Sequence, residues 1–414
     1  MNTKVYSILL FSLVVVSGCV EELSPNLDQW TKIVGSDLTS WAEEIYIEEN
    51  GDVFVFGSVG TDAGGLENIG ASVTRLDLNG NFIERRVYPL VETIDATGAG
   101  FLPINVSNSA RIRDVRSLTE GGFLLLGVFD EVTVEDGAGR SILVSLPFYM
   151  VIDEHLDQQH YFNLNPELAT TSGPVRIQSW FYDTQDGSFG IRSRLYAGSP
   201  QPIGYSLISL NQEGLPVLGD ISSSDEQFFG SIRSVDHVFY KDGSRYTLGQ
   251  RGNEFTIDDE NGNMVANLGF GGLTPFNDNA LFFQERADAS YLIVYSHPMS
   301  GDDEIRTLII DQDFIIREES NTIIVEDDEF VKGFIPLSNG NFAIYNINIK
   351  DIEPSATLYL MSPTFRRLKR WQLSGPPGSI AEDQDGNLIV AYNPVYNNQV
   401  VKSTIMKIPA SELF

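Results

Sequence analysis

Short apolar runs recur along the chain, and a tight-turn signal precedes each of them. Examples are residues 53–59 (VFVFGSV), 123–129 (FLLLGVF) and 388–394 (LIVAYNP). Runs of this length, bounded by turn residues, are typical of buried β-strands. No segment carries a helical pattern, so the sequence predicts an all-β protein.

The turn signals themselves form a repeat. They are Asn50-Gly51-Asp52, Glu120-Gly121-Gly122, Asp186-Gly187-Ser188, Asp242-Gly243-Ser244, Asp288-Ala289-Ser290, Asn339-Gly340-Asn341 and Asp385-Gly386-Asn387. Asn-Gly and Asp-Gly supply the positive φ that a two-residue hairpin requires, so each signal predicts a β-hairpin. The spacing of about 46 to 70 residues lies in the range of repeat folds.

Each repeat has a second half. Residues 71–78 (ASVTRLDL), for example, lead into a second turn at 77–80 and then into a fourth strand. Seven units of four strands, a to d, predict a seven-bladed β-propeller, with two stacked sandwiches as the structural alternative. Sandwiches would not need the same hairpin seven times.

The two ends of the chain predict how the ring closes. The last unit has only three strands, and residues 28–35 (DQWTKIVG) resemble the outer strand of the sixth unit, 368–375 (LKRWQLSG), with Trp30 aligned to Trp371. An N-terminal strand that completes the last blade would pair both edges. We therefore expect one propeller domain over residues 28–414.

Two segments carry a resemblance to known families. Residues 379–392 (SIAEDQDGNLIVAY) and 43–59 (EEIYIEENGDVFVFGSV) are similar to the strand-turn-strand of bacterial NHL and SMP-30-like propeller repeats. The Trp30 strand followed by such a unit resembles surface lipoprotein propellers. This resemblance implies the fold and little about activity, because propellers host many functions. Some SMP-30-like relatives are metal-dependent lactonases, but the ligands of that site cannot be placed in this sequence.

The N-terminus predicts an exported, lipid-anchored protein. Lys4, an apolar run at 5–16 and Val16-Ser17-Gly18 precede Cys19, the single cysteine. This resembles the lipobox of bacterial lipoproteins, which implies cleavage after residue 18 and a lipid on Cys19, followed by a linker at 19–27. An ordinary signal peptide is the alternative. We expect the outer membrane, on the cell surface or on the periplasmic face.

The charge of the chain excludes one class of partner. It has 57 acidic and 27 basic residues, a net charge of -30. Such a field repels phosphate backbones, which argues against nucleic acid and against electrostatic docking on an anionic leaflet. The lipid would then be the sole membrane attachment. One basic run, Arg366, Arg367, Lys369 and Arg370, is either a docking patch for an acidic partner or a set of edge charges that prevent aggregation.

Loop lengths predict where a binding site lies. The a–b and c–d turns are short, whereas the long connections, of types b–c and d–a, would share one face of the ring. They are residues 58–71, 90–107, 130–141, 164–174 and 297–304. Loops on one face are where binding residues gather.

Arginines near the start of the inner strands are the candidate channel residues. Arg111, Arg113, Arg176 and Arg233 would form a cationic patch if they point into the channel, where Arg suits bidentate capture of carboxylate or phosphate. The alternative is that they pair with acidic neighbours between blades.

These observations favour a surface binding or scaffold module for a protein or a glycan over an enzyme. The alternative is an extracellular hydrolase or lyase acting on a glycan or lactone through carboxylates at the channel mouth. No EF-hand loop, HExxH, GxSxG or phosphate loop is present. We predict no catalytic residue, cofactor or metal from motifs, and an irregular calcium site between loops stays open.

Overall fold

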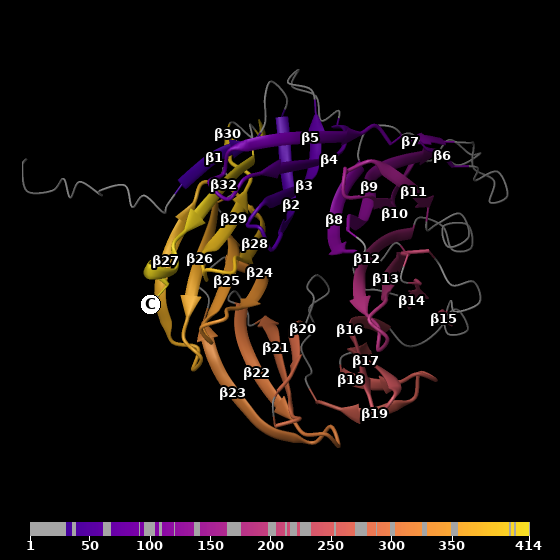
Figure 1. Ribbon diagram of the computed structural model, residues 1–414. Coiled ribbons are helices and arrows are strands. Elements are labelled where there is room, and N and C mark those ends of the chain that lie inside the picture. The colour runs from indigo at the N-terminus through magenta and orange to yellow at the C-terminus, as the bar shows by residue number, and fades with distance from the viewer. Residues whose placement is uncertain are drawn as a thin grey trace, which may run out of the picture.

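Seven four-stranded antiparallel blades are arranged in a ring in the computed structural model, so the protein is a seven-bladed β-propeller, as the repeats predict (Figure 1). A single parallel pair, Ser145 with Arg176, joins the second and third blades into one eight-stranded sheet. The structure describes residues 30–34, 39–60, 68–90, 92–94, 104–106, 110–119, 121–135, 141–163, 175–197, 204–211, 213–215, 222–223, 233–251, 254–269, 280–286, 288–298, 303–324, 329–348, 355–396, 399–400 and 403–413. Cys19 and its flanking segment lie outside these ranges.

The first four blades follow one another along the chain. Blade 1 is β2 (Thr39–Ile47), β3 (Val53–Gly60), β4 (Asn68–Leu76) and β5 (Phe82–Tyr88), and blade 2 is β8 (Ala110–Ser117), β9 (Phe123–Glu135), β10 (Ser141–Ile152) and β11 (Gln158–Asn163). Blade 3 is β12 (Val175–Asp183), β13 (Phe189–Ala197), β14 (Gly204–Ser209) and β15 (Ser222–Ser223), and blade 4 is β16 (Arg233–Lys241), β17 (Ser244–Arg251), β18 (Glu254–Asp259) and β19 (Met264–Asn267).

The last three blades complete the ring. Blade 5 is β20 (Ala280–Glu285), β21 (Tyr291–Pro298), β22 (Asp303–Ile310) and β23 (Ile316–Ile324), and blade 6 is β24 (Glu329–Pro336), β25 (Phe342–Asn348), β26 (Ser355–Met361) and β27 (Arg367–Leu373). Blade 7 is β28 (Pro377–Glu382), β29 (Leu388–Tyr392), β32 (Ser403–Ile408) and β1 (Trp30–Val34). Two small hairpins, β6 (Glu92–Ile94) with β7 (Ile104–Val106) and β30 (Val395–Tyr396) with β31 (Gln399–Val400), lie in connections.

Helical structure is nearly absent from the described part of the chain. Its one helical element is a 3₁₀ turn, η3 (Ala410–Glu412). No helix there is long and apolar enough to cross a bilayer.

The hairpin turns differ from the two-residue type that the Gly signals predict. In blade 1 the N–H of Gly51 donates to the Glu48 carbonyl at 2.9 Å, and the N–H of Glu48 donates to the Asp52 carbonyl at 2.9 Å. This is a type I turn closed by one residue with positive φ, here Gly51 at +88°. Among the described a–b turns, only Asp242-Gly243 is a two-residue turn with positive φ at both positions. The prediction of two-residue turns was therefore wrong at the other six.

The ring closes through the N-terminal strand, as predicted. β1 pairs antiparallel with β32, with Trp30 opposite Lys407 and Val34 opposite Ser403. Asn393, which is fully buried, links blade 7 to blade 1, because its side chain accepts from the Ala42 N–H at 2.8 Å and donates to the Ala42 carbonyl at 2.9 Å. A Cβ on Gly378 would lie 2.1 Å from the same carbonyl, so only glycine allows this approach.

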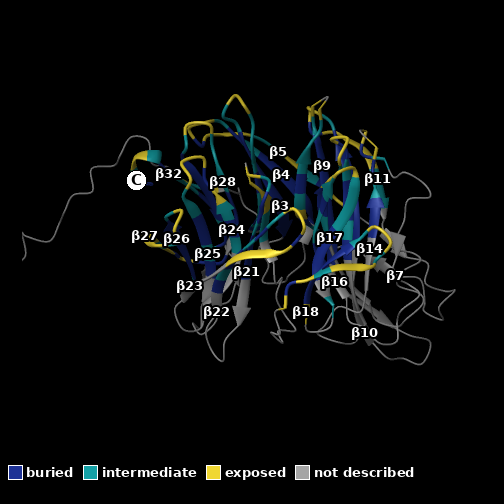
Figure 2. Cartoon of the chain, turned by 90° about the horizontal axis from the view of Figure 1, so that it is seen from below, coloured by how far each residue is buried: buried dark blue, intermediate teal, exposed yellow. Residues whose placement is uncertain are grey.

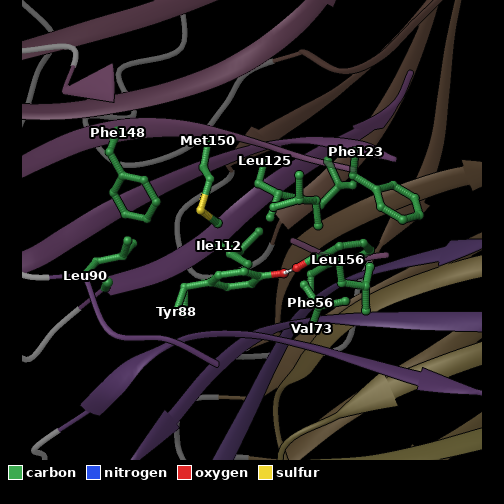
Figure 3. Close-up of a cluster of buried hydrophobic side chains, with 14 of the residues drawn as sticks. Phe56, Val73, Tyr88, Leu90, Ile112, Phe123, Leu125, Phe148, Met150 and Leu156 are labelled. Carbon is green, nitrogen blue, oxygen red and sulfur yellow. Dashed lines mark hydrogen bonds between the residues drawn. The ribbon is translucent and has the colours of Figure 1, made fainter. Parts of the chain in front are cut away.

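The core consists of apolar layers between neighbouring blades. Between blades 1 and 2, the ring of Phe123 packs against Phe54 and Phe56 with centroids 4.9 and 5.1 Å apart. In the same layer the Tyr88 hydroxyl donates to the Leu156 carbonyl at 2.7 Å, so the outer strand of blade 1 is tied to a turn of blade 2 (Figure 3).

The two faces of the ring differ. Exposed short turns stand together on one side of the ring, seen edge on in Figure 2. Because strands alternate in direction, the b–c and d–a connections fall on the opposite face. Parts of the predicted loops are strands instead: β9 continues to Glu135, where it pairs with Ser141. β3 and β4 likewise shorten loop 58–71 to residues 61–67, β21 and β22 shorten loop 297–304, and β6 and β7 lie inside loop 90–107. Loop 164–174 lies outside the described residues.

Candidate functional site at the inner strands

A β-bulge recurs in the innermost strand of six blades. The pairing register shifts between Ala42 and Glu44 in β2, and at matching places in β8, β16, β20, β24 and β28, while β12 pairs without a shift. A bulge bends the strand and re-aims its side chains. The six bulges therefore change which side chains face the axis at one level of the ring.

The residue after each of the six bulges lies four positions before the first residue of the a–b turn, and Trp180 has the same spacing in the regular strand β12. We call these seven residues the ring positions; they are Glu44, Asp114, Trp180, His237, Phe282, Gly333 and Ser379. Several of them contact the next blade: His237 stacks with Phe283, and Phe282 packs against Phe334. The ring positions are thus contacts between blades as well as residues near the axis.

Glu44 and Asp114 place two carboxyl groups at adjacent ring positions. The Ser379 hydroxyl donates to Glu44 Oε1 at 2.5 Å, and the Ile45 N–H donates to the same oxygen at 3.1 Å. No hydrogen bond within the described part of the chain engages Glu44 Oε2. Burial raises the pKa of Glu44 to about 7, and the Asp114 carboxylate adds to this rise, against the opposing effects of Ser379 and Arg116.

Asp114 is held more completely than Glu44. Its Oδ1 accepts from the Arg116 guanidinium at 2.7 Å and from the Val115 N–H at 2.9 Å, and its Oδ2 accepts from the Phe181 N–H of blade 3 at 2.8 Å. Burial raises the pKa of Asp114, while Arg116 and these N–H groups oppose the rise. Asp114 therefore joins blades 2 and 3, whereas Glu44 accepts hydrogen bonds from described residues through Oε1 alone.

A tyrosine from blade 6, Tyr345, lies within electrostatic range of Glu44 and Glu43. Gly333 has no side chain at its ring position, and a Cβ there would lie 2.1 Å from the Tyr345 ring. The ring of Tyr345 thus occupies this place. Burial raises the pKa of Tyr345, and the charges of Glu44 and Glu43 raise it further. Blades 6, 7, 1 and 2 all contribute a polar group to this cluster.

Two tryptophans next to the cluster each carry an arginine over the ring. The Arg111 guanidinium lies 5.5 Å from the centroid of Trp41, and its Nη1 lies 3.9 Å from the Glu43 carboxylate. The Arg192 guanidinium lies 4.5 Å from the centroid of Trp180. Both tryptophans are partly exposed.

The four arginines predicted from the sequence lie on inner strands but do not form one described patch. Arg111 pairs with Glu43 of the adjacent blade, which is the arrangement that the alternative interpretation describes. Arg113 is the exposed bulge residue of β8. The backbones of Arg176 and Arg233 lie in β12 and β16, opposite Tyr196 and Arg251, and their side chains lie outside the description. Capture of an anion by these four residues stays a prediction.

The arrangement can exchange a proton and donate or accept hydrogen bonds. A carboxyl group with a pKa near neutrality changes its protonation readily in that range. Within the described ranges, no group of three or more His, Cys, Asp or Glu side chains could hold a metal ion. Sequence reasoning missed Glu44, Asp114 and Tyr345. Glu44 and Asp114 each lie four residues before the a–b turn of their blade, and this constant spacing is a signal that the sequence contains. No comparable signal in the sequence indicates Tyr345.

Comparisons with known proteins concern the fold. No model of a protein family and no curated protein matches the chain. Similar solved structures include a protein of unknown function from Bacteroides caccae, at 11% identity over 73% of this chain and 89% of that one, with a TM-score of 0.40. Others are the polysaccharide lyase Uly1, at 10% identity over 89% and 90% with a TM-score of 0.49, and the dihydro-heme d1 dehydrogenase NirN, at 11% identity over 90% and 78% with a TM-score of 0.42. Similarity at this level shows no activity.

Proposed function

We propose that the protein is a lipid-anchored propeller of the cell surface that binds a protein or a glycan through the face opposite the short turns. One observation carries this proposal: the described hairpin turns share one face, so every b–c and d–a connection belongs to the other. Connections carried by a rigid scaffold are where binding residues gather.

A glycan array and a partner capture on cell lysate, both with the chain from Glu21 onward, would identify the ligand. A polyethylene glycol chain is then attached at Ala63→Cys in the β3–β4 connection, or at Asn79→Cys in an exposed turn of the opposite face. We expect the first adduct to weaken binding by about tenfold or more, equivalent to about 1.4 kcal/mol, and the second to leave it unchanged. The reverse result would assign binding to the turn face and refute the proposal.

The anchor has a separate test. Replacing Cys19 by Ser should move the protein from the membrane fraction to the soluble fraction and abolish incorporation of labelled fatty acid. A Cys19→Ser protein that stays in the membrane would exclude the lipid as the attachment. Accessibility of the wild-type chain to protease in intact cells distinguishes the cell surface from the periplasmic face.

A second candidate function is a hydrolase or lyase acting on an extracellular glycan or lactone. The observation that favours it is Glu44, whose pKa is near 7 and whose Oε2 is available among the described residues. A general acid or base contributes about 10²–10⁴-fold to a rate. Glu44→Gln should therefore reduce kcat by that factor on any substrate that the protein turns over. An unchanged kcat would remove Glu44 from the mechanism.

A further inference from the structure

Basic charge is concentrated in one sector of this acidic propeller. The whole chain has 27 basic and 57 acidic residues, yet residues 354–414 contain six basic and four acidic ones and are therefore net positive by two. These residues form the outer half of blade 6 and most of blade 7. The remaining blades thus carry the entire negative excess.

The cations of this sector lie at its outer edge. β27 is the outermost strand of blade 6, and Arg366, Arg367 and Arg370 are exposed on it and on its turn. A bulge places Arg367 opposite Met361 and Arg370 opposite Tyr359, so both guanidinium groups lie over the Tyr359 ring, 5.7 and 5.8 Å from its centroid. Arg367 and Arg370 therefore share one side of β27, whereas Lys369, opposite Leu360, lies on the other side and donates to the Glu412 carbonyl.

Apolar side chains accompany these cations. Leu368 of β27 is 44% exposed, and Ile33 of β1, the outer strand of blade 7, is 67% exposed. β27 and β1 are neighbouring outer strands on the rim of the ring (Figure 1). Exposed arginine next to exposed aliphatic side chains is the composition of surfaces that lie at the interface of an anionic bilayer.

The position of the predicted anchor points to the same edge. β1 begins at Trp30, 11 residues after Cys19, so a lipid on Cys19 lies within about 38 Å of this strand along an extended chain. The lipid would thus hold blade 7 and the adjacent blade 6 near the membrane.

We propose that the outer edge of blades 6 and 7, formed by Arg366, Arg367, Leu368 and Arg370 together with Ile33, docks on the anionic lipid headgroups of the membrane that holds the anchor. The inference rests on the lipid anchor of the proposed function. It replaces the expectation, drawn from net charge alone, that the lipid is the only attachment. Screening limits the repulsion from the acidic blades, because the Debye length is about 8–10 Å at physiological salt.

A pair of matched cysteine variants tests this surface in the full, acylated chain. Leu368→Cys and Val265→Cys both lie on outer strands and are equally accessible in the native protein, at 44% and 45% exposure, but Val265 belongs to blade 4. Each variant is labelled with an environment-sensitive dye and reconstituted into vesicles of phosphatidylcholine, with or without phosphatidylglycerol. We expect a blue shift only at position 368 and only with phosphatidylglycerol.

The charge requirement is tested in the labelled Leu368→Cys protein. Replacing Arg366, Arg367 and Arg370 together by Gln should abolish the shift, whereas Arg317→Gln on the outer strand of blade 5 should leave it intact. Equal signals at positions 368 and 265 in protein that floats with vesicles would refute the docking surface but not the anchor. Protein that does not float refutes the anchor and the surface together. A shift at 368 that rises with protein concentration in the absence of vesicles would assign the patch to a second copy of the chain and refute lipid docking.

Discussion

Replacing Glu44 by Gln should make the stability of the propeller less dependent on pH. In the folded protein, burial and the neighbouring Asp114 raise the pKa of Glu44 from 4.5 to about 7. A carboxyl whose pKa is raised on folding binds more protons in the folded state than in the unfolded state between these two values. Its stabilising contribution is complete below pH 4.5 and is lost as the pH rises through 7. Gln is neutral throughout.

The magnitude follows from the same pKa values. At about 1.4 kcal/mol for each pH unit of difference between folded and unfolded pKa, the interval from 4.5 to about 7 gives an upper limit of about 3.5 kcal/mol. The real value is smaller, because Glu44 retains some contact with solvent. The free energy of unfolding of Glu44→Gln, relative to wild type, should therefore rise by about 2–3 kcal/mol between about pH 5 and about pH 8.

Urea unfolding followed by tryptophan fluorescence at the two pH values measures this difference. Exposed turn carboxylates such as Asp77 and Asp186, whose hydrogen bonds hold their pKa below the usual 3.8, stay ionised across the interval and cancel in the comparison. The exposed Glu213→Gln is the control and should show a constant difference from wild type. A constant difference for Glu44→Gln as well would mean that Glu44 is ionised like a surface carboxyl, and the argument for a proton-exchanging site would fail.

Three further changes test the packing. Asn393→Ala leaves the buried N–H and carbonyl of Ala42 without their hydrogen-bond partners, which costs about 1–3 kcal/mol for each group. Urea unfolding should therefore show a free energy of unfolding lower by about 2–5 kcal/mol, whereas the exposed Asn79→Ala should lower it by less than about 0.5 kcal/mol. Tyr149→Phe removes a buried hydroxyl that has no hydrogen-bond partner among the described residues, so the free energy of unfolding should stay constant or rise by about 1–2 kcal/mol; a loss above about 1 kcal/mol would show that the hydroxyl has a partner. Ala289→Gly removes the strain of a φ of +58° in the a–b turn of blade 5 and should increase the free energy of unfolding by about 0.5–1 kcal/mol, seen as a higher melting temperature. A lower melting temperature would contradict strain at this position.

The fold was predictable because its repeat is local. Each a–b hairpin needs one residue with positive φ next to an apolar strand, and Gly51, Gly187, Gly340 and Gly386 mark four of these turns directly in the sequence. The turn type was less accessible. A Gly after Asn or Asp suits either a two-residue turn or a type I turn with a bulge, and the choice depends on the strand register, which no single dipeptide encodes.

The candidate site was predictable only in part, because its geometry depends on bulges. A strict alternation along β2 would place Glu43 and Glu44 on opposite sides of the strand. The bulge between Ala42 and Glu44 changes this relation, and the position of a bulge follows from contacts between blades that are distant in sequence. Tyr345 illustrates the same limit, since it reaches the cluster only because Gly333, on a different strand, has no side chain.

Glu44 belongs both to the closure of the ring and to the candidate site. Its Oε1 accepts from Ser379 of blade 7, at the same junction where Asn393 and Gly378 contact Ala42 of blade 1. Its Oε2 accepts no hydrogen bond among the described residues. A ligand that binds the ionised carboxylate must therefore offset the cost of burying this charge and of placing it near Asp114. It follows that ligand affinity and the stability of the closing junction should both depend on pH through the protonation of Glu44.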